Sequence, residues 1–148
     1  MKIEELIDLS YNPAAYISQD FGVRWVRDPT VPHNGIDIAG LAKFTKVFAS
    51  GKIIKAGYHF EDPIHAFGNR VAIELNDFKG FGMWLAHFDG LPMTARIGND
   101  IENELVGFVG SSGSSTGFHL HIGIRDLITG EWHNPNGFID FSFLLGGD

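Results

Sequence analysis

Hydrophobic residues along this chain fall mainly into short runs, in which they alternate with polar residues or glycine. Segment 69–75 shows the pattern most cleanly, because Val71, Ile73 and Leu75 would lie on one face of a strand. Gly, Pro, Asn and Asp residues separate the runs, and these residue types favour turns. Strands are therefore expected near residues 35–39, 46–49, 51–57, 69–76, 81–88, 104–110, 117–125 and 131–133.

Helical spacing is confined to the two ends of the chain. Residues 3–9 could form a short helix, which Pro13 would end. Four apolar residues within 138–145 recur at helical spacing and predict a closing helical turn that packs on the sheet. The whole pattern predicts an all-β fold of mainly antiparallel sheets, with minor short helices at the termini. A chain of 148 residues, 44% of them hydrophobic, suits one domain over residues 1–148.

Composition then narrows the classes of function. The formal net charge is −7, and the 11 basic residues are scattered, so nucleic acid is not an expected partner. No apolar run reaches the roughly 18 residues that a membrane span needs. The absence of cysteine excludes disulfides and thiolate metal sites. The first residues alternate acids with apolar residues, which is not the pattern of a secretory signal peptide.

Two histidines on one predicted strand are the most informative polar residues. The apolar face of strand 117–125 is expected to carry Phe118, Leu120, Ile122 and Ile124. The opposite face would carry His119 and His121 between two glycines, so two nitrogen bases would stand beside open space. Such a pair can line the floor of a substrate site. Two solvent-facing histidines on a half-exposed strand are the alternative interpretation.

Further metal-binding side chains are available elsewhere in the chain. A catalytic zinc usually has three protein ligands from His and carboxylate, with a fourth position left to water. His33 and Asp37 offer an imidazole and a carboxylate, although this spacing alone is uninformative and its default interpretation is a surface histidine with a turn aspartate. His87 ends the otherwise apolar row of segment 81–88, where it could instead be a partly buried histidine bonded to the backbone. No role is assigned to His59, His65 and His133.

Short motifs occur in a characteristic order along the chain. Residues 114–121 match S-T-G-x-H-L-H, which is the most specific of them. The others are F-G-x-R within 18–24, H-x-G-x-D at 33–37, the strand pair 47–57, the strand 67–73, A-H within 85–88, and Asn134-Pro135. Together they resemble the lysostaphin/LytM family of zinc endopeptidases. The resemblance covers about residues 18–137.

The resemblance implies a complete active site. It places one zinc per chain on His33, Asp37 and His121, and it makes His87 and His119 catalytic residues that do not bind the metal. Both are expected to carry protons near neutral pH, because an unperturbed imidazole has a pKa near 6.5. The implied fold is β-sandwich-like, with a groove walled by loops. Segment 58–66 is expected to be one such wall and to set substrate choice.

The implied activity is hydrolysis of peptide bonds in bacterial peptidoglycan, in the cross-bridge or the stem peptide. The protein would act as a monomer on the cell wall, outside the cytoplasm. Since no signal peptide is present in the sequence, it would be a phage-delivered lysin or a trimmed catalytic domain.

Three segments depart from the family pattern. Glu74 and Leu75 follow Ile73, where the family often has a histidine, and Leu85 replaces an aromatic residue. Residues 122–124 replace Phe-Glu. These changes concern substrate preference more than metal binding.

Two other classes of protein remain to be distinguished from an enzyme. An inactive LytM-like module would bind wall peptide or regulate another wall hydrolase, but the five metal and catalytic residues are intact. A lipoyl- or biotinyl-type carrier domain would need a lysine at a hairpin tip, and the last third of the chain has no lysine.

Overall fold

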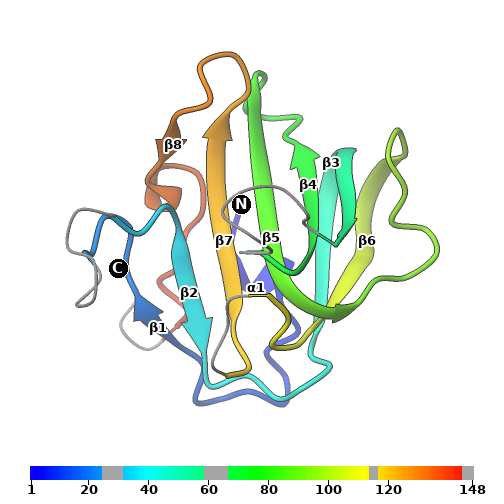
Figure 1. Ribbon diagram of the computed structural model, residues 1–148. Helices are drawn as coiled ribbons and strands as arrows, with labels where there is room; N and C mark the ends of the chain where they lie inside the picture. The colour runs from blue at the N-terminus through cyan, green and yellow to red at the C-terminus, as the bar shows by residue number, and fades with distance from the viewer. Residues whose placement is uncertain (25–31, 59–66, 114–116, 145–148) are drawn as a thin grey trace.

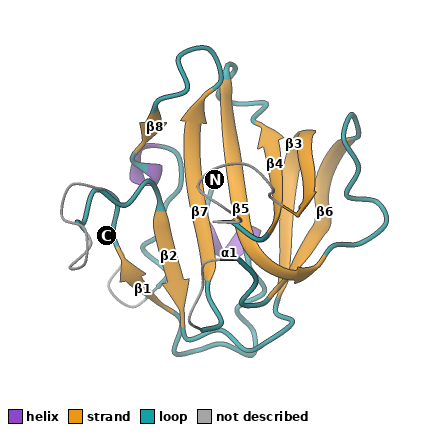
Figure 2. Cartoon of the chain, in the orientation of Figure 1, coloured by secondary structure: helices purple, strands orange, loops and turns teal. Residues whose placement is uncertain are grey.

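The computed structural model describes residues 1–24, 32–58, 67–113 and 117–144, which are mostly β-structure (Figure 1, Figure 2). The strands are β1 Tyr16–Gln19, β2 Ile36–Ala39, β3 Lys46–Tyr58, β4 Asn69–Glu74, β5 Phe81–Gly90, β6 Asp100–Val109, β7 Leu120–Asp126 and β8 Trp132–His133. Helical structure in these ranges is limited to α1 Ile3–Leu6 and the 3₁₀ helix η1 Pro135–Gly137. Within the same ranges, no helix has the length and hydropathy to cross a membrane.

All the strands of the described residues belong to one antiparallel sheet. They pair in the order β1-β2-β7-β5-β4-β3-β6, and β8 lies beside β7. The end of β5 also pairs with β6, so that β3, β4, β5 and β6 close on one another. The predicted all-β, mainly antiparallel fold is confirmed. The closed pairing of β3 to β6 means that the single sheet curls back on itself at this end.

Alternation along the central strands separates a core face from a second face that carries polar side chains. The buried apolar residues of β2 and β7 are Ile36, Ile38, Leu120, Ile122 and Ile124. They share a core with Ile3 from α1, which lies behind the sheet in Figure 1. Asp37 and His121 alternate with these core residues and therefore face the other side, which we call the site face.

Residues 46–57 form one strand where the sequence predicted two. The prediction placed a break at Ser50, between strands 46–49 and 51–57, because serine and glycine favour turns. In the structure the pairing of β3 with β6 shifts register between Ala49 and Gly51. The turn-forming residues are thus absorbed by a β-bulge, and the strand continues through it.

The predicted N-terminal helix is shorter than expected, and the predicted C-terminal helical turn is absent from the described residues. The first ends at Leu6 instead of residue 9. The predicted helical turn near 138–145 is wrong within the described residues, where η1 ends at Gly137. Asp140 instead makes a parallel bridge to Lys2, which draws this segment toward the N-terminus. Phe141 and Leu144 are nevertheless buried, so the pattern identified core residues without identifying their backbone.

The prediction that Phe118 lies on the apolar face is also wrong. Strand β7 begins at Leu120, and Gly117 and Phe118 lie in a bend before it. Strand alternation therefore does not extend to Phe118, whose side chain is 46% exposed.

His87 does not share a face with the apolar residues of β5 before it. Its φ is +68°, and β5 shifts register against β4 between Asn69 and Val71. This bulge interrupts the alternation, so Phe88 takes the next core position and is fully buried. His87 is thereby directed toward the histidines of the site face, as its ring contacts show.

Replacing Phe88 by alanine should lower the free energy of unfolding by about 3–5 kcal/mol, since it leaves a cavity in the core. Phe143→Ala is the matched control, because that ring is 64% exposed, and its effect should stay within about 0.5 kcal/mol. Denaturant unfolding in the presence of a chelator measures both. Equal losses for the two variants would contradict the assignment of Phe88 to the core.

Candidate metal centre

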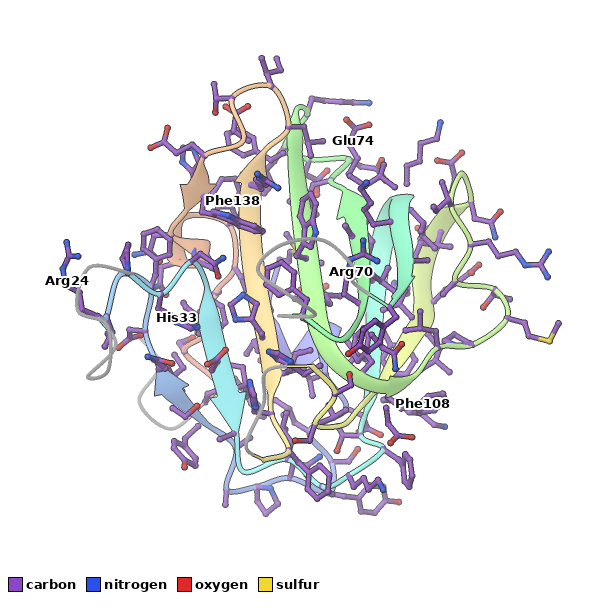
Figure 3. The ribbon with its side chains drawn as sticks, in the orientation of Figure 1. Arg24, His33, Arg70, Glu74, Phe108 and Phe138 are labelled. Carbon is purple, nitrogen blue, oxygen red and sulfur yellow. The ribbon has the colours of Figure 1, made fainter. Side chains whose placement is uncertain are left out.

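Three side chains from β2, β7 and the segment before β2 meet on the site face. Strand pairing sets Asp37 directly opposite His121. Nδ1 of His121 lies 2.9 Å from Oδ1 of Asp37, and Nε2 of His33 lies 3.3 Å from Oδ2. One potential ligand atom from each residue falls within 4.8 Å of the others. Figure 3 shows His33 beside β2.

Backbone contacts hold His33 in the orientation that aims Nε2 at Asp37. Nδ1 of His33 lies 3.0 Å from the carbonyl oxygen of Asp20. A carbonyl oxygen can only accept, so Nδ1 donates and Nε2 is left as the basic nitrogen. The main chain of His33 also pairs with Gly22 and Val23 at 2.8 and 2.9 Å.

Gly35 allows the close approach of β2 to the His121 ring. A Cβ at residue 35 would collide with the carbonyl oxygen of Ile122 and would lie 2.7 Å from Cε1 of His121. Real Cβ atoms do not tolerate such distances, so a larger residue would displace the ring or the strand. The glycine of H-x-G-x-D therefore has a steric role at this site.

Burial and the central carboxylate shift the pKa values of the three residues in different directions. Burial alone would raise the pKa of Asp37, but hydrogen bonds with His121 and His33 outweigh it and hold that pKa far below its usual value. Burial would lower the pKa of His33, yet Asp37 and the Asp20 carbonyl raise it overall. For His121 burial dominates, and its pKa is lowered. At neutral pH the set therefore has an ionised Asp37 beside a neutral His121.

The donor atoms suit a small, borderline-soft cation. Zinc is bound by imidazole nitrogens and carboxylate oxygens at about 2.0–2.2 Å, with tetrahedral geometry. The distances of 3.3 Å from Asp37 to His33 and 2.9 Å from Asp37 to His121 bring the donor atoms close enough to share one ion. Nε2 of His121 is buried and has no hydrogen-bond partner among the described residues. Nδ1 is the nitrogen of His121 that contacts Asp37.

His87 and His119 stand beside this set as a second pair. Their ring centroids are 4.6 Å apart, and the His87 ring is 6.0 Å from that of His121. Nδ1 of His87 lies 2.7 Å from the Ser112 carbonyl oxygen, and Nδ1 of His119 lies 3.0 Å from that of Gly117. Both carbonyls accept, so each neutral ring keeps Nε2 as its basic nitrogen. Nε2 of His119 is 3.9 Å from Oδ1 of Asp37.

The environment of His87 changes one sequence-based expectation. The sequence alone predicts an ordinary imidazole pKa near 6.5 for this residue. Burial, reinforced by the nearby imidazoles of His119 and His121, lowers the pKa of His87 to about 4. The contact with the Ser112 carbonyl opposes this shift without cancelling it. His87 is therefore neutral at pH 7.

The structure brings all five sequence-predicted residues together, and it adds neighbours that the sequence did not indicate. The His121 ring is 5.4 Å from Phe67, which is 6.0 Å from Trp132. A Cβ at residue 123 would lie 2.7 Å from the Trp132 ring. The only signal in the sequence was Gly123, at a position where the family often has Glu. The predicted role of loop 58–66 concerns residues 59–66, which lie outside the described ranges.

Comparison with known proteins agrees with this architecture. The sequence model described as "Peptidase family M23" matches residues 31–135. The fold is similar to the catalytic domain of the antimicrobial peptidase lysostaphin from Staphylococcus simulans, with a TM-score of 0.72 and 23% identity over 86% of this chain and 94% of that chain.

Two further structures are also similar. A mutant catalytic domain of the prophage-encoded M23 protein EnpA from Enterococcus faecalis has a TM-score of 0.68 and 25% identity, over 84% of this chain and 91% of that one. A zinc-containing peptidase from Vibrio cholerae has a TM-score of 0.65 and 23% identity, over 82% of this chain and 36% of that one.

Proposed function

Because the chain belongs to peptidase family M23 and is thus a hydrolase of peptide bonds, we propose that it is a zinc-dependent endopeptidase acting on bacterial peptidoglycan. The observation that carries the proposal is the meeting of His33, Asp37 and His121, with their donor atoms within 4.8 Å. Two imidazoles and one carboxylate are a common catalytic zinc set, and three protein ligands leave one position for water.

In this proposal His33 binds through Nε2 and His121 through Nδ1, on either side of Asp37. When bound, zinc supplies Lewis acidity toward the scissile carbonyl and lowers the pKa of a bound water toward about 7. The carbonyl of Asp20 keeps the proton of His33 on Nδ1, and this keeps Nε2 basic.

His87 and His119 then handle protons and orient the substrate. His87 is neutral at pH 7, because burial lowers its pKa to about 4. Its Nε2 can accept a proton from the attacking water and pass it to the leaving amine. His119 is less buried and has Nε2 near Asp37. When Nε2 of His119 carries a proton, it is placed to donate a hydrogen bond to the carbonyl oxygen of the scissile peptide. It is also placed to exchange a proton with solvent.

The proposal extends to the setting in which the enzyme works. A single domain over residues 1–148 would act as a monomer on the cell wall, outside the cytoplasm. With a net charge of −7, long-range attraction to an anionic wall is not expected. Recognition would then depend on local contacts with the substrate. Phe67, which packs against His121, and Trp132, which packs against Phe67, are candidates for these contacts. The inactive-module alternative is not favoured, since no ligand or catalytic histidine is replaced.

Asp37→Ala should remove both zinc and activity, because the two remaining ligands hold the metal too weakly. Asp77→Ala, which changes an exposed carboxylate between β4 and β5, is the matched control and should keep both. Elemental analysis and hydrolysis of purified peptidoglycan measure the two effects. Full zinc occupancy and an unchanged rate in Asp37→Ala would show that the ligand assignment is wrong.

Apparent zinc affinity should fall about tenfold for each pH unit below the raised pKa of His33. One proton then competes with the metal, since the pKa values of Asp37 and His121 are both lowered. Titration of the metal-free protein with zinc between pH 5 and pH 7 gives the slope. A slope of zero would remove His33 from the ligands, and a slope of two would mean that His121 is protonated as well.

His87→Ala and His119→Ala should each retain one zinc but lose at least about a hundredfold in hydrolysis rate, the usual scale for a general acid or base. Zinc content and rate must be measured on the same preparations. Loss of metal from His119→Ala together with retention in His121→Ala would mean that the two histidines of the H-L-H motif have exchanged roles.

A further inference from the structure

His87 has a backbone conformation that an L-residue rarely adopts. Its φ of +68° lies in the left-handed region, which is strained for a non-glycine residue and persists only where neighbours enforce it. The pairing of β5 shifts register against β4 between Leu85 and Phe88, and against β6 between Phe88 and Gly90. The contacts that stabilise this bend therefore also determine where the His87 ring points.

Ser112 contacts the bend through both its side chain and its backbone. Its hydroxyl donates to the carbonyl oxygen of Phe88 at 2.6 Å and accepts from the backbone N–H of Asn69 at 3.0 Å. Its carbonyl accepts from Nδ1 of His87 at 2.7 Å. The hydroxyl contacts of Ser112 thus fix the position of its own carbonyl group, which in turn holds the His87 ring.

Asn69 ties the same bend to β4. Its side-chain amide donates to the carbonyl oxygens of Phe88 and Asp89, at 3.3 Å each. Gly68 has a φ of +59°, and a Cβ there would collide with the backbone and hydroxyl of Ser112. The start of β4, the end of β5 and the segment around Ser112 can meet only because residue 68 has no side chain.

We propose that Ser112 and Asn69 are positioning residues for His87, which fix its ring orientation and keep its proton on Nδ1. The consequence is that Nε2 faces the metal centre as a proton acceptor. The inference rests on the catalytic role assigned to His87 in the proposed function. Neither residue is a metal ligand or a proton carrier in that function, and both act through His87.

This role differs from a general contribution to stability. A structural hydrogen bond elsewhere in the sheet would leave the tautomer of His87 unchanged when removed. The hydroxyl of Ser50 offers the comparison, because it accepts from the backbone N–H of Asn103 at 2.8 Å and joins β3 to β6. Ser50→Ala is therefore the matched control for Ser112→Ala.

The first test measures the imidazole directly by long-range ¹H–¹⁵N correlation on zinc-loaded protein without substrate. Wild type and Ser50→Ala should show His87 with a protonated Nδ1 and an unprotonated Nε2. In Ser112→Ala and Asn69→Ala, the two nitrogen shifts of His87 should either be averaged, which reports a mixture of tautomers, or be reversed, which reports a proton on Nε2. Unchanged His87 signals in both variants would overturn the inference. This result is independent of peptidase activity, so it separates failure of the positioning role from failure of the proposed function.

The second test is a double-mutant cycle with the rate of peptidoglycan hydrolysis. Ser112→Ala should lower kcat by about tenfold to a hundredfold, the usual scale for losing a hydrogen-bond partner that orients a functional histidine. KM should change little. Ser112→Thr, which keeps the hydroxyl, should retain most of kcat. In the His87→Ala background, Ser112→Ala should cause no further loss, because it acts through the missing ring. Additive losses would contradict the proposal.

Discussion

The register between β2 and β7 is the constraint on which the rest of the site depends. Asp37 pairs with His121, while Ile36 and Ile38 pair with Ile122 and Leu120. Slipping either strand by one residue would send the carboxylate or the imidazole into the core, because side chains alternate between faces. The buried isoleucines therefore fix the position of the polar atoms. The hydrophobic pattern of these strands therefore also determines the geometry of the candidate metal site.

The site concentrates polar groups where solvent is largely excluded, and the carboxylate makes this tolerable. His33 and His121 are buried, and the side chain of Asp37 is only 14% exposed. A buried charge without partners is costly, but Asp37 contacts an imidazole on each side. The same contacts raise the pKa of His33, so in the metal-free protein a proton can stand in for the cation. Binding of the proposed zinc would then exchange one positive group for another.

The sequence correctly predicted that His33, Asp37 and His121 lie together, because strand alternation and short motifs are local properties. It predicted the wrong side of β5 for His87, since the bulge that redirects this residue comes from β4, β6 and Ser112. A strand-period pattern contains no information about those contacts. The ordinary pKa expected for His87 failed for the same reason, because burial is a tertiary property.

Zinc binding by His33, Asp37 and His121 is the central claim, and anomalous X-ray diffraction at the zinc edge tests it most directly. A crystal of the protein as purified should show one anomalous peak per chain, bounded by Nε2 of His33, a carboxylate oxygen of Asp37 and Nδ1 of His121. Nε2 atoms of His87 and His119 should face that peak without ligating it. A peak bound by His87 or His119, or no peak after addition of stoichiometric zinc, would contradict the account.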